Sequence, residues 1–303
     1  MGIEGLLKEA SAEYRLNEPL KPYTTFKIGG PADIMIFPKD EREIINTTEI
    51  LKKNGIEYFF MGSGSNLLVS DKGYRGAVIK TDRLNNIKLI DDTLIEAESG
   101  AKLLETAVFA YKNSLSGLEF SYGIPGTAGG AVYMNAGAYD GEMKNVVAKT
   151  AYIDENGKMK TFTGDEHSFT YRKSVFTGKN VCIIKTLLRL NKGDKEQIKA
   201  AMDDFLNRRE EKQPLNMPSA GSVFKRPEGY FTGRLIGDSG LKGFAVGGAK
   251  VSEKHSGFIV NTGNATCKDV IELIKIIKDR VYNSFGIELK CEIIYKGEGE
   301  VKL

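Results

Sequence analysis

Residues 122–130 constrain the fold of this chain more than any other stretch. They hold four glycines and one proline within nine positions. Glycine loses more backbone freedom on folding than any other residue, so such a loop is either packed around a ligand or mobile at the surface. The flanking residues, 118–120 and 131–134, are largely apolar, which favours a buried position. We therefore expect this loop to approach a ligand closely.

A second glycine-rich loop, residues 62–67, follows an expected strand. It is not a Rossmann fingerprint, because Leu67 stands where the third small residue should be and residues 67–73 read as a strand and turn. It is not a Walker loop either, since no Gly-Lys-Ser/Thr follows. Its glycines and hydroxyls still allow backbone N–H groups to form an anion nest. A plain turn between strands fits this motif alone equally well, but the two loops together favour a dinucleotide pocket.

The hydrophobic pattern predicts a mixed α+β chain. A helix is expected after Asp40, since an acid follows three residues later at Glu43, and Asn54-Gly55 should end it. Gln213-Pro214 is the expected linker to a second domain. Further helices should begin near Ala101 and Lys195, and a long one should contain Val270, Leu273, Ile274, Ile277 and Val281. Strands are expected over residues 56–60, 76–80, 94–98, 146–154, 158–162, 181–190 and 286–296.

Composition excludes several classes of partner. The 303 residues are 41% hydrophobic with a net charge of +3 and no basic stripe, so we expect no nucleic acid partner. Residues 1–10 lack the apolar core of a signal peptide, no apolar run spans a bilayer, and no obligate protein partner is inferred. The three cysteines (Cys182, Cys267 and Cys291) and the two histidines (His167 and His255) are too dispersed for a disulfide framework or a metal site. This dispersal favours a reducing cytoplasm.

Four segments in order, residues 24–33, 62–67, 124–139 and 220–225, resemble the UDP-N-acetylenolpyruvoylglucosamine reductase (MurB) family. The resemblance covers roughly residues 24–297. It implies an α+β FAD-binding fold of the vanillyl-alcohol oxidase type (PCMH-like) with a C-terminal α+β substrate-binding domain. The implied division is an FAD-binding subdomain over residues 1–80, a second over 81–212 and the substrate domain over 213–303.

The resemblance also implies the reaction. NADPH reduces non-covalently bound FAD, and the flavin reduces the enolpyruvyl ether of a UDP-sugar to give UDP-N-acetylmuramate, a precursor of the peptidoglycan cell wall. No histidine lies in the glycine loops, so nothing suggests covalent flavin attachment. The expected FAD contacts are Gly62, Ser63, Gly64, Ser65, Asn66, Leu67, Gly123, Ile124, Pro125, Gly126, Thr127, Gly129 and Gly130.

Three residues match the catalytic positions of the family. Hydride arriving at C3 of the enolpyruvyl group leaves negative charge at C2, which needs a fixed donor or cation and then a proton. The family's arginine matches Arg172, its serine proton donor matches Ser222, and its glutamate matches Glu292. Taken singly, these would read as a surface arginine, a turn serine and a solvent-facing glutamate on a strand. Only the ordered match to the family favours catalytic roles.

The chain departs from the longer form of the family in two ways. There is no room between residues 181 and 222 for an extra substrate-covering loop with a tyrosine. Arg226 also follows Lys225 where the longer form has asparagine, and its planar fork suits phosphate oxygens. Lys225 and Arg226 are therefore the expected substrate contacts. Lys250, Lys254 and His255 are further candidates, although a solvated turn explains them slightly better.

Two other functions are compatible with parts of this sequence. A flavin oxidase of the same fold, acting on an alcohol or a sugar, would usually carry a histidine in a glycine loop, and this chain has none there. A non-catalytic flavin or nucleotide-sugar sensor would have no reason to keep a proton donor at Ser222. The reductase remains the favoured interpretation.

Overall fold

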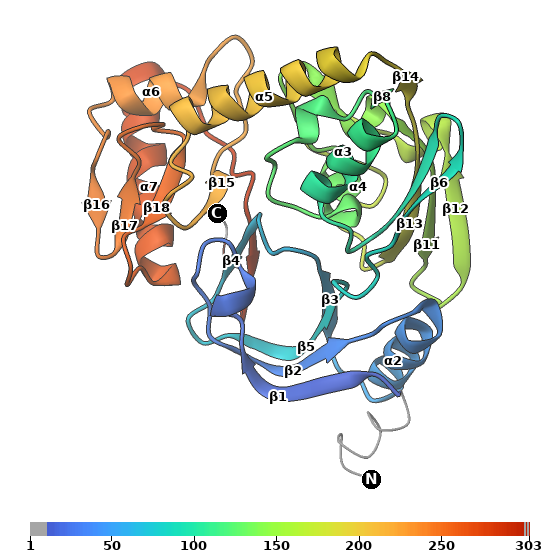
Figure 1. The fold of residues 1–303 in the computed structure, drawn as a ribbon. Coiled ribbons are helices and arrows are strands. Elements are labelled where there is room, and N and C mark those ends of the chain that lie inside the picture. The colour runs from blue at the N-terminus through green and yellow to red at the C-terminus, as the bar shows by residue number, and fades with distance from the viewer. Residues whose placement is uncertain (1–10, 300, 302) are drawn as a thin grey trace. The chain divides into compact units, whose positions relative to one another are not determined.

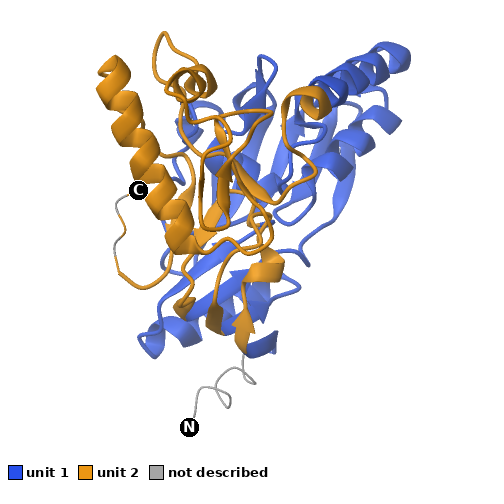
Figure 2. Ribbon diagram, turned by 90° about the vertical axis from the view of Figure 1, so that its left-hand side faces the viewer, with its two compact units in different colours: residues 1–16, 34–63, 76–208 blue, residues 17–33, 64–75, 209–303 orange. Residues whose placement is uncertain are grey.

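The computed structural model describes residues 11–299, 301 and 303, so the expected amphipathic start over residues 1–10 lies outside the described residues. The chain forms two compact units (Figure 2): unit 1 comprises Met1–Leu16, Ile34–Ser63 and Gly76–Arg208, and unit 2 comprises Asn17–Asp33, Gly64–Arg75 and Arg209–Leu303. The chain therefore passes between units inside the first glycine loop. The functional division at residues 80 and 212 stays a prediction.

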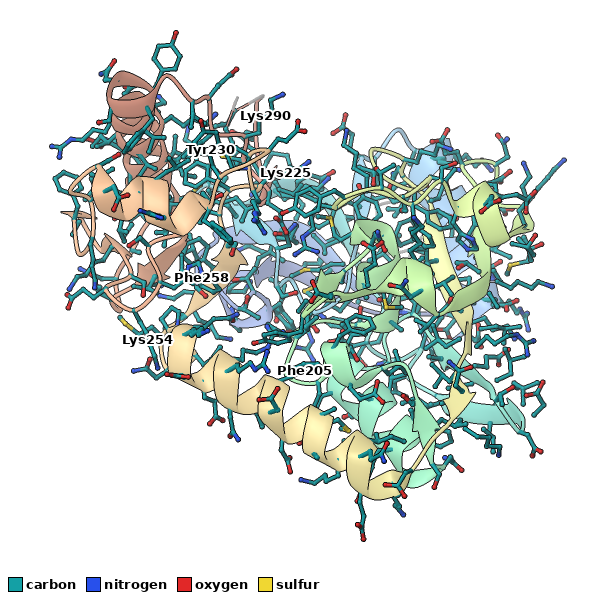
Figure 3. The ribbon with its side chains drawn as sticks, turned by 90° about the horizontal axis from the view of Figure 1, so that it is seen from above. Phe205, Lys225, Tyr230, Lys254, Phe258 and Lys290 are labelled. Carbon is teal, nitrogen blue, oxygen red and sulfur yellow. The ribbon has the colours of Figure 1, made fainter. Side chains whose placement is uncertain are left out.

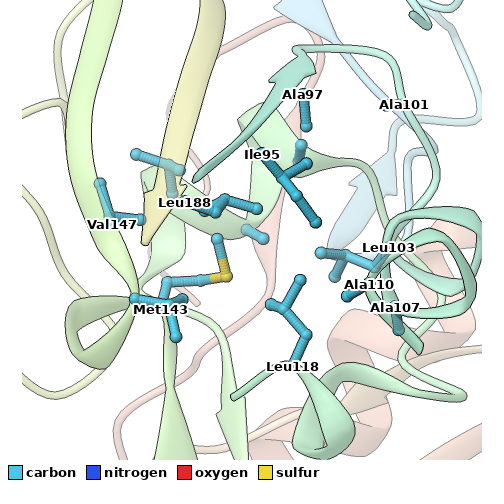
Figure 4. Packing of buried hydrophobic residues seen from close by; sticks show 14 of the residues in the cluster. Ile95, Ala97, Ala101, Leu103, Ala107, Ala110, Leu118, Met143, Val147 and Leu188 are labelled. Atoms are coloured by element: carbon cyan, nitrogen blue, oxygen red, sulfur yellow. The ribbon is translucent and has the colours of Figure 1, made fainter. Parts of the chain in front are cut away.

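The larger sheet of unit 1 has five strands, each antiparallel to its neighbours, and two helices cover it (Figure 1). Helix α4 packs on β13 and β7, and α3 packs on α4. The core between them contains Ile95, Leu188 and Leu103 (Figure 4). Val132 of α4 belongs to the same core. The elements are β12 (Met159–Thr163), β11 (Val147–Ile153), β13 (Cys182–Arg189), β7 (Leu94–Glu98), β6 (Ile87–Asp91), α3 (Leu103–Lys112) and α4 (Ala128–Met134).

The second sheet has the order β1-β2-β5-β3 and packs against α2. As predicted, α2 begins after Asp40, whose carboxylate accepts the Glu43 N–H at 2.8 Å. Leu51 of α2 packs in the core of this sheet, and Ile44 packs with Cys182 of β13, so α2 joins the two sheets of unit 1. The elements are β1 (Glu13–Pro19), β2 (Pro31–Phe37), β5 (Tyr74–Lys80), β3 (Tyr58–Met61) and α2 (Glu41–Lys53).

Unit 2 is assembled from three separate segments. The Asp71 carboxylate accepts the Cys267 N–H at 2.7 Å at the start of α7, and the buried Asn261 side chain donates to the Phe26 carbonyl. Helix α7 packs on β16, β17 and α6. The elements are β15 (Ser219–Ser222), β18 (Phe258–Asn261), β17 (Ala249–Val251), β16 (Ala245–Val246), α6 (Thr232–Asp238), α7 (Cys267–Phe285), and the parallel pair β4 (Leu67–Val69) and β19 (Ile294–Lys296).

One long helix and several short elements complete the chain. Helix α5 (Lys195–Lys212) begins where the sequence predicts it and ends just before Gln213-Pro214. The remaining elements are β8 (Leu115–Ser116) paired with β14 (Asn191–Lys192), β9 (Gly137–Ala138) paired with β10 (Gly141–Glu142), and the 3-10 helices η1 (Lys21–Tyr23), η2 (Glu119–Ser121), η3 (Met143–Asn145) and η4 (Gly164–His167).

The sequence does not predict one helix, and it predicts one strand that is too long. Helix α4 was not predicted, because its first turn is rich in glycine, a poor helix former. The final strand, expected over residues 286–296, is confined to Ile294–Lys296. The residues before it keep alternating burial, with Leu289 and Ile293 buried. However, their β pairing in the described chain is an isolated bridge between Cys291 and Phe224.

His167, five residues before Arg172 in the sequence, is buried in unit 1. Its two ring nitrogens contact the Gly164 carbonyl and the Thr150 hydroxyl, each at 2.9 Å. Its ring stacks on Phe169 with centroids 5.0 Å apart. Burial lowers the pKa of His167 below its ordinary value of 6.5.

This lowered pKa predicts acid sensitivity. Above 6.5 His167 is neutral in both states, but below that value the unfolded chain binds its proton first. The free energy of unfolding should therefore fall as the pH drops below about 6.5, by at most about 1.4 kcal/mol per pH unit from this residue. Urea unfolding at pH 7.5 and 5.5 measures this effect. The free energy of unfolding should fall less between these two pH values for His167→Gln than for wild type. An identical loss in both proteins would contradict the prediction.

Candidate active site

The start of the first glycine loop, Gly62, contacts the second glycine loop inside unit 1. A side chain on Gly62 would place its Cβ 2.5 Å from the Thr127 hydroxyl oxygen, so only glycine fits there. The Gly126 carbonyl accepts the Leu103 N–H at 3.1 Å, as part of an isolated bridge between Lys102 and Thr127. The loops are thus neighbours although they lie about 60 residues apart in sequence.

The amides at the start of α4 are satisfied within the protein. The Gly129 N–H donates to the Ser99 carbonyl at 2.9 Å, and the Gly130 N–H donates to the Thr127 hydroxyl at 3.4 Å. In the rest of the loop, the Ile124 N–H donates to Ser121 at 3.0 Å and Pro125 has no N–H. The helix N-terminus therefore leaves few donors for an anion.

Open donors lie in the loops instead. Across the described residues, the backbone N–H groups of Ser63, Gly123 and Gly126 have no hydrogen-bond acceptor. Gly64 and Gly123 have left-handed backbones, with φ of 63° and 85°. Alternation of such residues makes the concave nests of N–H groups that bind phosphate. Open N–H groups of this kind are chemically suited to a phosphate.

Arg172 is the third residue of a tight turn in unit 1. Thr170 and Lys173 exchange backbone hydrogen bonds of 3.0 and 3.1 Å, and Arg172 has φ of 56°. The side chain is half-buried, not splayed into solvent, and its Nη2 donates to the Gly137 carbonyl at 3.1 Å. The guanidinium is therefore held by a residue of the motif over residues 124–139.

Asn135, at the end of α4, fixes this turn and was missed by the sequence analysis. It is fully buried with φ of 44°. Its Nδ2 donates to the Thr170 carbonyl at 3.1 Å and to Glu142 Oε2 at 3.0 Å, and its Oδ1 accepts the Lys144 N–H at 2.9 Å. Asparagine is the residue other than glycine that most readily ends a helix in the left-handed conformation, which was the available signal.

Ser222 lies in unit 2 at the end of β15, after a bulge. Ser219 is opposite Val260 and Ser222 is opposite Phe258, so residues 219–222 of β15 face residues 258–260 of β18, with one extra residue on β15. Gly221, with φ of 75°, absorbs the extra residue. Ser219 and Ser222 therefore share one face of the sheet, although regular alternation would put them on opposite faces. Ser222 is half-buried there.

Glu292 lies on the segment next to Ser222. The Glu292 N–H donates to the Val223 carbonyl at 2.8 Å, and the Asn66 side chain donates to the Glu292 carbonyl at 3.1 Å. The predicted solvent-facing alternative does not describe Glu292 well, because it is half-buried. Asn66 and Leu67 also pair with Ile294, so this end of the first loop holds the Glu292 segment in place.

The expected substrate contacts lie on the same part of unit 2. The Lys225 N–H donates to the Lys290 carbonyl at 2.8 Å, and Figure 3 shows these two lysines close together. The Arg226 guanidinium lies 3.9 Å from the centre of the Phe231 ring, and its Nε donates to the Tyr230 carbonyl at 3.1 Å. Arg226 is thus oriented by its neighbours.

The three weaker candidates have partners within unit 2. Lys250 pairs with Glu253, Lys254 donates to the Glu210 carbonyl, and His255 Nδ1 accepts the Gly257 N–H. Lys250 and Lys254 also line a cavity of about 600 Å³ in this unit. The structure thus brings Ser222, Glu292, Lys225 and Arg226 onto adjoining segments of unit 2 and Arg172 into unit 1.

The comparisons first define the class of protein. The FAD binding domain family matches residues 32–163, which include both glycine loops. A glucose dehydrogenase, Phl p 4.0202, shares the fold with a TM-score of 0.50 at 14% identity over 94% of this chain and 59% of its own. The chain is an FAD-binding flavoprotein. No helix in residues 11–299 combines the length and hydrophobicity needed to cross a membrane.

The family follows from closer relatives. The C-terminal domain of UDP-N-acetylenolpyruvoylglucosamine reductase matches residues 213–295. The reductase of Caldanaerobacter subterraneus subsp. tengcongensis is 49% identical over 98% of this chain and 97% of its own, and that of Clostridium perfringens is 48% identical over 92% and 91%. The MurB structure from Thermus caldophilus has a TM-score of 0.81 at 35% identity, covering 94% and 98%. The chain belongs to the UDP-N-acetylenolpyruvoylglucosamine reductase family.

These findings confirm the family, the FAD-binding α+β fold, the FAD cofactor and the oxidoreductase class expected from the sequence. They do not test the individual residues, whose roles remain predictions.

Gly62→Ala should weaken FAD binding. The new methyl group would lie 2.5 Å from the Thr127 hydroxyl oxygen and push the two loops apart. Overpacking of this kind costs about 1–3 kcal/mol, which corresponds to about 5- to 150-fold in the FAD dissociation constant. Flavin fluorescence titration measures it. Gly237→Ala, whose Cβ would meet Ser256 at an ordinary 3.6 Å, is the matched control. Equal FAD affinity in both variants would refute the contact.

Asn135→Ala should loosen the Arg172 turn. It leaves the buried Thr170 carbonyl without its donor, at a cost of about 1–3 kcal/mol in unfolding free energy. Turnover should fall while FAD is still bound. Asn54→Ala also removes an asparagine that donates to a carbonyl at a helix end, but from an exposed position, so its turnover should be unchanged. A stable Asn135→Ala protein with normal turnover would exclude this role.

Proposed function

We propose that this chain reduces the enolpyruvyl ether of UDP-N-acetylglucosamine enolpyruvate to UDP-N-acetylmuramate, with NADPH as the reductant. The observation that carries the proposal is the 49% identity over 98% of the chain to a protein named as the reductase of this substrate class. The reaction supplies a precursor of peptidoglycan. Three free cysteines suit a reducing cytoplasm, where this chain is proposed to act.

The cofactor contributes the redox step. Bound FAD supplies hydride transfer between NADPH and C3 of the enolpyruvyl group. The open N–H groups of Ser63, Gly123 and Gly126 are the proposed donors to its pyrophosphate. The other expected FAD contacts shape the loops around them, and the binding is proposed to be non-covalent.

Arg172 is proposed to stabilise the negative charge that develops at C2 and the adjacent carboxylate. A guanidinium presents paired donors to carboxylate oxygens in one plane. Because Arg172 is held by its turn and by Gly137, its donors need little reorganisation when charge develops. Glu292 is proposed to orient the same intermediate. Lys225 and Arg226 are proposed to bind the diphosphate of the substrate, which makes residues 213–303 the substrate domain.

Ser222 is proposed to deliver the proton to C2. A serine hydroxyl is a weak acid, so it can act only where the intermediate is a strong base and water is excluded. The half-buried position of Ser222 and the bulge at Gly221 support this role.

Ser222 variants test the whole proposal by stopped-flow spectroscopy of the two half-reactions. In wild type, NADPH should bleach the flavin and the enolpyruvyl substrate should restore its colour. Ser222→Ala should keep FAD binding and reduction by NADPH, because neither needs the acid. Its reoxidation by substrate should slow by at least about 10². Ser222→Cys should retain more activity, since a thiol also carries a transferable proton.

The two kinds of failure are distinct. Wild-type flavin that is not reoxidised by the enolpyruvyl substrate would overturn the proposed reaction. Wild-type reoxidation with an equally fast Ser222→Ala protein would overturn only the role of Ser222.

A further inference from the structure

Lys80, at the end of β5, is buried at 2% exposure. Burial of an ammonium group is unfavourable, and it lowers the pKa of Lys80, while the carboxylate of Asp82 opposes that shift. The Lys80 Nζ lies 2.5 Å from Asp82 Oδ2 and donates to the Gly62 carbonyl at 2.5 Å. An apolar side chain would fill this position at less cost, so the contact with Gly62 calls for an explanation.

The register of the sheet brings Lys80 to the start of the first glycine loop. Strands β3 and β5 are parallel, with Met61 opposite Lys80. The Thr81 N–H donates to the Met61 carbonyl at 3.0 Å, and the Lys80 ammonium holds the next carbonyl, that of Gly62. The carbonyls of Met61, which ends β3, and of Gly62, which begins the loop, are therefore held by Thr81 and Lys80, two consecutive residues at the end of β5.

Holding the Gly62 carbonyl also fixes the direction of the Ser63 N–H. The two groups belong to one planar trans peptide, so they point in opposite directions. When Lys80 holds the carbonyl on one side, the N–H is presented on the other side. This N–H is one of the open donors of the loop.

A second lysine holds the next residue of the loop, Ser63. The Lys102 Nζ donates to the Ser63 hydroxyl at 3.2 Å and lies 3.8 Å from Asp82 Oδ1. Asp82 therefore pairs with both lysines, and both lysines contact the Gly62-Ser63 peptide or its side chain. All of these contacts lie within unit 1.

We infer that Lys80 is a positioning residue for FAD: it holds the Gly62 carbonyl so that the Ser63 N–H faces the pyrophosphate. This rests on the proposed role of the first loop in FAD binding. Asp82 keeps the buried ammonium aligned with the carbonyl. The positive charge also favours an anion at the loop.

The test separates positioning from plain stabilisation of the fold. Lys80→Met keeps the apolar stem and removes the ammonium. The FAD dissociation constant should rise about 10- to 100-fold, the range for losing a hydrogen bond to a charged group. The melting temperature of the flavin-free variant should stay the same or rise, because an apolar side chain is better suited to burial. Lys185→Met, which removes an ion-paired lysine from the other sheet of unit 1, should leave FAD affinity unchanged.

Asp82→Asn is a second variant that keeps Lys80 and changes a partly exposed residue. It should weaken FAD binding several-fold, because the ammonium loses its partner. Unchanged FAD affinity in Lys80→Met, or in Asp82→Asn should Lys80→Met not fold, would overturn the inference. A lower melting temperature of flavin-free Lys80→Met with normal FAD affinity would also overturn it. A wild-type protein that does not retain FAD would instead refute the proposed function.

Discussion

The close packing of Gly62 on the Thr127 hydroxyl is the contact on which the rest of unit 1 depends. Thr127 caps α4, so the position of the first loop and the start of this helix are set together. Helix α4 has seven residues, a length of roughly 10 Å, and Asn135 at its other end holds the Arg172 turn. The start of the first glycine loop therefore meets the second glycine loop at the start of one short helix, and the end of the same helix supports the turn of Arg172, a catalytic candidate.

In unit 2, the main constraint is the orientation of Ser222 at the end of strand β15. Regular alternation would have turned Ser222 away from the face of Ser219. The bulge at Gly221 restores it, and the bridge between Phe224 and Cys291 places the Glu292 segment beside it. The backbone, more than side-chain packing, determines where these two residues lie.

Local signals predicted much of the fold, and long-range contacts explain what was missed. The boundaries of α2 followed from Asp40 and Asn54, since caps are set by residues adjacent in sequence. The extent of the last strand depends on a partner 227 positions away, as Ile294 of β19 pairs with Leu67 of β4. Lys80 reads as an ordinary end of a strand until the register shows it beside Gly62. The family motifs located the site, but the residues supporting it came only from the structure.

The motifs that carry the family resemblance mix two kinds of residue. Gly30 is needed because a Cβ there would lie 2.2 Å from the Asp71 carbonyl oxygen, and Thr25 donates to the Ser219 carbonyl at 2.7 Å. Such residues build the backbone. In the loops, the amides of Gly129 and Gly130 are used within the protein, whereas those of Ser63, Gly123 and Gly126 find no acceptor in the described chain. The proposed anion binding therefore relies on loop amides and buried lysine charge more than on the dipole of α4.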